Sequence, residues 1–101
     1  MVIDWAQIEG FDWDAGNDRK SADRHAVTQA EAEQAFFNAP LLVLEDARHS
    51  QDEPRWHALG RTDDDRRLHV TFTLRGGGAL LRVISARDQS RKERTAYARA
   101  D

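Results

Sequence analysis

Cysteine is absent from this chain of 101 residues, which excludes disulfide bonds and metal sites with thiolate ligands. No segment approaches the ~18 consecutive apolar residues of a transmembrane helix. The first residues, Met1-Val2-Ile3-Asp4-Trp5, lack the basic stretch followed by an apolar stretch that marks a secretion signal. We therefore expect a soluble protein that stays in the reducing cytoplasm and makes no contact with a membrane.

The apolar residues suffice for one compact core, because 40% of the chain is apolar and it contains three Trp and four Phe. At this length we expect a single domain over residues 1–101.

Charge is unevenly distributed along the chain. The formal net charge of −3 argues against a nucleic-acid partner, because phosphate binding draws on Lys and Arg. Residues 1–60 carry 5 basic and 12 acidic side chains, whereas residues 61–101 carry 10 basic and 6 acidic ones. Nine of those ten basic residues are Arg, whose planar side chain suits phosphate recognition, so a polyanionic partner stays open for this part. The simpler alternative is a solvated surface with uneven charge.

Two capping boxes mark the starts of helices, Thr28-Gln29-Ala30-Glu31 and Ser90-Arg91-Lys92-Glu93. Asp14 is a further candidate cap, and Asn38-Ala39-Pro40 ends the second helix. Alternating or apolar runs predict strands, which are separated by a polar loop over 48–54, an acidic turn and three glycines. The predicted strands are 8–13, 41–44, 55–62, 67–75 and 79–87, and the predicted helices are 15–25, 28–38 and 90–99.

This order, β-α-α-β-β-β-β-α, predicts an α+β domain with an antiparallel sheet, two N-terminal helices and a C-terminal helix. The helices are expected to cover one face of the sheet and to leave the other open. If both hairpins close simply, Leu59 and Ser85 flank His69, and Arg61, Arg67 and Arg87 form one row. Alternation then gives a core face of Trp56, Ala58, Leu68, Val70, Phe72, Leu80, Ile84 and Ala86, and an open face of His57, Arg61, Arg67, His69, Thr71, Arg75, Ser85 and Arg87.

Arg82 conflicts with this register, because it falls on the core face. A bulge at 76–78 would move it to the open face, so Arg82 and Arg87 are equal candidates for a role there. A face with several Arg and two His suits RNA cleavage without a metal, with His as base or acid and Arg stabilising the phosphorane. The alternative is a solvated sheet face. Because His25 and His49 are isolated in sequence, we expect no metal site and no cofactor.

A succession of short motifs runs along most of the chain. They are Phe11-Asp12-Trp13-Asp14, Arg24-His25-Ala26-Val27-Thr28, Ala35-Phe36-Phe37, Leu42-Val43-Leu44-Glu45-Asp46, Arg55-Trp56-His57-Ala58-Leu59-Gly60-Arg61, Val70-Thr71-Phe72-Thr73-Leu74-Arg75, Arg82-Val83-Ile84-Ser85-Ala86-Arg87 and Arg91-Lys92-Glu93-Arg94. In their order and spacings these motifs resemble the BrnT family, formerly a domain of unknown function, and the resemblance spans residues 11–99.

The resemblance implies a RelE-like fold and a ribonuclease toxin that arrests translation. It also implies a BrnA-type antitoxin whose ribbon-helix-helix part binds the operon's promoter DNA, so that the toxin meets DNA only through it. Dimerisation of that antitoxin would give a two-plus-two heterotetramer.

Our hypothesis from the resemblance and the Arg-rich face is a metal-independent endoribonuclease acting on messenger RNA. The scissile phosphate would be bound by Arg61, Arg75, Arg82 and Arg87. His69 is the first choice for the base or acid, and His57 and Glu93 are the second choices. The rival hypothesis is a catalytically degenerate toxin that serves as partner and corepressor of its antitoxin; a stand-alone structural protein is the third.

One departure from the family pattern concerns the end of the first helix. The family shows Lys-His-Gly where this chain has Arg24-His25-Ala26. Since Gly is the residue that adopts positive φ without cost, we expect this loop to differ or to carry strain.

Overall fold

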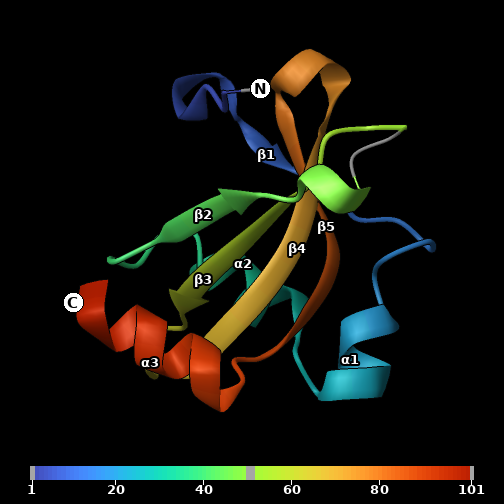
Figure 1. Cartoon of the computed structure of the whole chain (residues 1–101). Coiled ribbons are helices and arrows are strands. Elements are labelled where there is room, and N and C mark those ends of the chain that lie inside the picture. The colour runs from blue at the N-terminus through green and yellow to red at the C-terminus, as the bar shows by residue number, and fades with distance from the viewer. Residues whose placement is uncertain (1, 50–51, 101) are drawn as a thin grey trace.

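The computed structural model describes residues 2–49 and 52–100, and its elements follow the predicted order of strands and helices. The expected α+β class is confirmed (Figure 1). Short 3-10 helices occur at Trp5–Gln7, Ala47–His49 and Gly76–Gly78. The main elements are β1 (Gly10–Phe11), α1 (Lys20–His25), α2 (Gln29–Gln34), β2 (Leu42–Glu45), β3 (Trp56–Arg61), β4 (Arg67–Arg75), β5 (Leu80–Asp88) and α3 (Arg91–Ala100). Residues 50 and 51 of the predicted loop lie outside the described residues.

The five strands form one sheet in the order β1-β5-β4-β3-β2. Neighbours are antiparallel except β1, which runs parallel to β5 through Gly10 and Phe11. The prediction of a purely antiparallel sheet was therefore wrong at this edge. No hairpin dictates the direction of β1, because two helices and three strands separate it from β5 in the sequence.

The first helix begins at Lys20, five residues later than predicted, because Asn17 fixes the preceding turn. The Asn17 side chain is buried; it accepts from the Asp14 amide at 2.8 Å and donates to the Val83 carbonyl at 2.8 Å. Asp14 does not cap a helix; its carboxylate accepts from the Gly16 amide at 2.8 Å. Further along, the Ser21 hydroxyl accepts from the Ala86 amide at 2.7 Å. This segment therefore covers the edge of β5 beyond its short pairing with β1.

Both predicted capping boxes are confirmed. The helix that Thr28 begins, α2, lies against the core face of the sheet, where Gly60 permits a close approach. A Cβ at Gly60 would lie 2.5 Å from the Ala35 carbonyl oxygen, so this strand position tolerates no side chain. Beside it Phe72 stacks on Trp56, with ring centroids 5.7 Å apart, and meets Phe36 edge to face at 5.2 Å.

A bulge in the β4–β5 ladder lies between Thr71 and Phe72 rather than at the glycine turn. Leu81 and Val83 are therefore in the core, and the prediction of Leu80 and Ile84 for the core was wrong. The three glycines form the turn itself, with φ values of 62°, 67° and 100°.

The bulge, together with a turn in which Arg75 pairs with Leu80, changes the neighbours of His69. Leu59 lies opposite it on β3, as predicted, but Arg87 rather than Ser85 lies opposite it on β5. Arg61 pairs with Arg67 as expected, whereas Arg87 lies two pairs further along, opposite His69, and does not extend that row.

The second face of the sheet is not open along its whole length, contrary to the prediction. α3 lies across one end of it, opposite the face that carries α2 (Figure 1). Tyr97 of α3 is fully buried, and its hydroxyl donates to the Pro40 carbonyl at 2.6 Å. Among the described residues no helix is long and apolar enough to cross a membrane.

Candidate active site

Two histidines lie side by side on the sheet face that carries α3. His57 of β3 and His69 of β4 have ring centroids 4.8 Å apart, with an angle of 40° between the ring planes. They are diagonal neighbours, because His57 pairs with Thr71 and Leu59 pairs with His69. Alternation of side chains thus brings two groups that can exchange protons near neutral pH to one place.

Both ring nitrogens of His57 have partners. Nε2 lies 2.9 Å from Oδ2 of Asp46, and Nδ1 lies 3.1 Å from the Thr71 hydroxyl. Asp46 follows β2 directly and also contacts Nδ1 of His49 at 3.0 Å. Burial opposes its ionisation, but the hydrogen bonds from His49 and the charge of His57 outweigh this and lower the pKa of Asp46. The carboxylate therefore orients the His57 ring through Nε2.

His69 is more enclosed, with 12% of its side chain exposed. Its Nδ1 is buried and has no hydrogen-bond partner among the described residues, and its Nε2 lies 3.9 Å from Oε2 of Glu93. Burial, followed by the positive charge of Arg87, lowers the pKa of His69 below its usual value of 6.5. His69 is consequently neutral at pH 7 and able to accept a proton.

Arg87 and Glu93 form a bidentate ion pair beside His69. The guanidinium donates to the two carboxylate oxygens at 2.8 and 3.0 Å. Glu93 also accepts from the Ser90 amide at 2.8 Å, so the capping box of α3 fixes the carboxylate that holds Arg87. The hydrogen bonds from Arg87 lower the pKa of Glu93 to about 2. A carboxylate of such low basicity is a poor proton acceptor, which argues against Glu93 as general base or acid.

A cavity of about 510 Å³ opens beside this cluster, between β2, β3, β4 and α3. Its wall is mostly aliphatic, and the polar groups lie together on one side. This arrangement is typical of a site that encloses the apolar part of a ligand and directs a few polar groups at its reacting part. The lining residues are Leu41, Leu42, Val43, Leu44, His57, Leu59, His69, Glu93 and Ala96.

Arg61 and Arg75, two of the predicted site residues, lie outside this cluster. Arg61 ends β3, where its Nε donates to the Ala39 carbonyl at 2.9 Å. Arg75 ends β4 and forms an ion pair with Glu53 at 3.1 Å. It is six residues from His69, which places it roughly 20 Å away along the strand.

Arg82 is also distant from the histidines. The bulge turns it away from the core, opposite Thr73, and its guanidinium meets Asp12 at 3.3 Å and Asp14 at 3.0 Å. Hydrogen bonding to Asp14 raises the pKa of Arg82, and 14% of its side chain is exposed. Arg82 therefore joins the N-terminal segment to β5, and of the four predicted arginines only Arg87 lies with the histidines.

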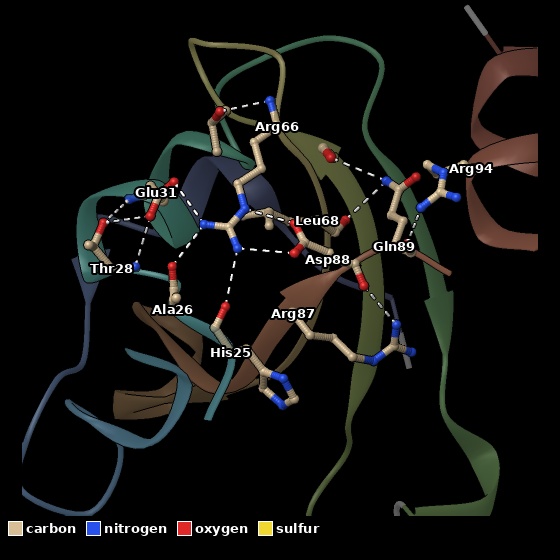
Figure 2. A network of polar contacts seen from close by, with 12 residues as sticks. His25, Ala26, Thr28, Glu31, Arg66, Leu68, Arg87, Asp88, Gln89 and Arg94 are labelled. Atoms are coloured by element: carbon tan, nitrogen blue, oxygen red, sulfur yellow. Dashed lines mark hydrogen bonds and ion pairs between the residues drawn. The ribbon is translucent and has the colours of Figure 1, made fainter. Parts of the chain in front are cut away.

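Arg66, which the sequence did not single out, forms the densest set of polar contacts around one side chain (Figure 2). It donates to the carboxylate of Asp88 at 2.7 and 3.1 Å and to Glu31 at 3.2 Å. It also donates to the carbonyls of His25 and Ala26 at 3.1 and 2.8 Å. Arg66 thus ties the junction of α1 and α2 to the end of β5, and it does not line the cavity.

Asp46 and Thr71 were likewise not predicted as site residues. Thr71 was placed on the histidine face, but nothing in its surroundings in sequence marks it as a partner of His57. Asp46 approaches His57 only when β2 and β3 pair, with a loop between them. Only the register of β2 and β3 brings Asp46 and His57 together, so no local sequence motif predicts this contact.

Comparison with known proteins gives one match over most of the chain. A family model described as the ribonuclease toxin BrnT of a type II toxin-antitoxin system matches residues 13–93. The matched segment contains every member of the histidine cluster, including Asp46, Arg87 and Glu93. No curated protein matches the chain.

Proposed function

The chain belongs to the BrnT family of ribonuclease toxins of type II toxin-antitoxin systems, and we propose that it is itself an active endoribonuclease. The proposed active site is the cavity beside His57, His69 and Arg87. The observation that carries the proposal is the 4.8 Å separation of the two histidine rings, with Arg87 at the ladder position opposite His69. The substrate we propose is messenger RNA in the cytoplasm, with arrest of translation as the consequence.

The proposed reaction is an internal transesterification that needs no metal. Neutral His69 accepts the proton of the 2′-hydroxyl on Nε2, the ring nitrogen that is not buried. The 2′-oxygen bonds to phosphorus, and the bond from phosphorus to the 5′-oxygen breaks. His57 acts in its imidazolium form in this step: oriented by the contact of Nε2 with Asp46, it gives the leaving 5′-oxygen the proton on Nδ1, the nitrogen that lies 3.1 Å from the Thr71 hydroxyl. The products are a 2′,3′-cyclic phosphate and a 5′-hydroxyl.

Arg87 supplies positive charge for the phosphorane that forms between these steps. Its bidentate pair with Glu93 fixes the guanidinium beside His69 in advance, so that little reorganisation is needed during the reaction. The aliphatic wall of the cavity, with Leu42 and Leu59, receives a base or the ribose and excludes water. Since Arg61, Arg75 and Arg82 lie elsewhere, they take no part in these steps.

The test uses purified chain and a short RNA, with each variant checked for folding by its thermal melting. We expect His69→Ala and Arg87→Ala to lower the cleavage rate by roughly a hundredfold or more. Arg75→Ala, a change on the same strand as His69, is the matched control and should keep the parent's rate. Equal rates for His69→Ala and the parent would overturn the assignment.

A toxin of this family acts with an antitoxin, and we propose a BrnA-type partner in a two-plus-two assembly that binds promoter DNA through its ribbon-helix-helix part. We propose further that this antitoxin covers the cavity. Support comes from Leu44, which lies at the cavity on edge strand β2 with 69% of its surface exposed. An apolar segment laid there would bury Leu44 and block His57 together. A complex in which Leu44 and His57 keep their exposure would contradict this.

The competing proposal is a catalytically degenerate toxin that survives as the partner and corepressor of its antitoxin. The acidic residues 1–60 favour it, because their charge repels RNA. Normal growth on expression without the antitoxin, together with intact antitoxin binding, would support this alternative. Growth arrest with new RNA ends would exclude it.

A further inference from the structure

The outer side of α3 carries a row of arginines that the proposed chemistry does not use. α3 buries Tyr97 and directs Glu93 toward Arg87, whereas Arg91, Arg94 and Arg99 are exposed. Their spacing of three and five residues places them on one side of the helix. Of the ten residues of α3, four are basic and one is acidic.

These three charges lack the carboxylate partners that most other arginines here have. Arg66, Arg75, Arg82 and Arg87 each meet an Asp or Glu within 3.3 Å. Within residues 2–49 and 52–100, Arg91, Arg94 and Arg99 form no ion pair; Arg94 donates only to the backbone carbonyl of Gln89, at 2.9 Å. Their positive charge is therefore available to an anion from outside the chain.

Arg67 connects this row to the active site. Its guanidinium lies 5.5 Å from the centre of the Tyr97 ring, and it shares a shallow depression of about 570 Å³ with the α3 arginines. Arg67 is two residues from His69 on the same face of β4, which separates their Cα atoms by roughly 7 Å. The depression is lined by Arg67, Arg91, Arg94, Thr95, Ala98 and Arg99.

From this arrangement we infer that α3 and Arg67 form a binding surface for the ribose-phosphate backbone of single-stranded RNA that continues from the cavity. The inference rests on the proposed function, since it extends the path of the same substrate. The side chains that line the depression include no aromatic ring, so it offers no platform for stacking bases. Binding along α3 is therefore driven by phosphate charge and is independent of base sequence.

The test measures binding of a fluorescent single-stranded 2′-O-methyl oligoribonucleotide of mixed sequence, which lacks the free 2′-hydroxyl and is not cleaved. The variant is the triple change Arg91→Gln, Arg94→Gln and Arg99→Gln. The control is Arg19→Gln, Lys20→Gln and Arg24→Gln, which removes the same charge from exposed positions on and beside α1. Thermal melting establishes that both variants are folded.

We expect the α3 variant to bind roughly tenfold more weakly or worse, and the slope of log affinity against log salt to fall by about 2, as for three lost phosphate contacts. The α1 control should bind like the parent. Equal affinity of the α3 variant and the parent, or equal losses in both variants, would overturn the inference.

Cleavage of unmodified RNA separates the two proposals. A parent that cleaves RNA while the α3 variant binds and cleaves equally well refutes the α3 surface and leaves the proposed function intact. A parent that neither binds nor cleaves refutes both. If the α3 variant keeps RNA binding but loses binding of the antitoxin, the surface serves an acidic protein segment and the inference is wrong.

Discussion

Arg87 lies directly opposite His69 in the β4–β5 ladder, and this pairing depends on the bulge between Thr71 and Phe72. The extra residue in β5 lets Leu81 and Val83 face the core, while Arg87, beyond the bulge, faces the histidines. Without the bulge, strict alternation would place apolar side chains of β5 in the core on one side of this point only. The bulge thus allows one strand to serve both the core and the proposed site.

The pKa of Glu93 predicts how stability depends on pH. Its folded pKa of about 2 lies below the usual 4.5, so the stabilisation is complete above pH 4.5 and is lost as the pH falls toward 2. Glu93 contributes up to about 3 kcal/mol to the free energy of unfolding in this way. Urea unfolding between about pH 6 and pH 3 should show a flatter pH profile for Glu93→Gln than for the parent. Glu9→Gln, at an exposed position, should leave the profile unchanged. If the parent, Glu93→Gln and Glu9→Gln all lost stability with the same dependence on pH, this account would be contradicted.

His69 should titrate below its usual value because burial and Arg87 both disfavour its protonation. Proton NMR of its ring should give a midpoint under 6.5 in the parent and a higher one in Arg87→Gln. The acid limb of the cleavage rate should move upward in pH with the same substitution, since His69 must be neutral to act as base. Because the pKa of His69 is lower in the folded chain, the unfolded chain binds the proton first as the pH falls below 6.5, and the folded chain becomes less stable. A midpoint at or above 6.5 in the parent would be incompatible with the assigned role.

Arg66 should be essential for stability rather than for cleavage. Replacing it with Met leaves Asp88 and the carbonyls of His25 and Ala26 without their donor, which should cost roughly 2–4 kcal/mol in free energy of unfolding. Arg61→Met, at a more exposed arginine, should cost less than about 1 kcal/mol. Chemical denaturation measures both. Similar losses for the two variants would show that the contacts of Arg66 contribute little.

Ala26 occupies the left-handed conformation, with φ 54° and ψ 38°, at the end of α1. The strain expected where the family shows Gly is thus present. Ala26→Gly should raise the free energy of unfolding by about 1 kcal/mol, because Gly adopts this conformation without the Cβ clash. Ala22→Gly, inside the same helix, is the control and should be destabilising by a similar amount. Destabilisation by both changes would mean that the loop relaxes around Ala26 without strain.

Features set by near neighbours could be predicted from the sequence. The Thr28 and Ser90 capping boxes span three residues each, and alternation alone placed His57 and His69 on one face. Alternation also predicted correctly which side chains of β3 and β4 face the core, since both strands are regular between Trp56 and Phe72.

Features set by distant partners could not be predicted. The bulge is a property of β4 and β5 together, and Asn17 blocks a helix through its bond to Val83, 66 residues away. The same holds for Asp46 beside His57 and for Arg66, whose partners come from three separate segments. In each case the side chain looks like an ordinary surface residue until the sheet brings its partner close.

The most direct test of the central claim is the chemistry of the RNA ends that the purified chain produces in the presence of a chelator. The account predicts 2′,3′-cyclic phosphate and 5′-hydroxyl ends, formed by the parent and by Arg75→Ala and absent with His69→Ala. Intact RNA, or ends that carry a 5′-phosphate, would contradict transesterification by the His57 and His69 pair.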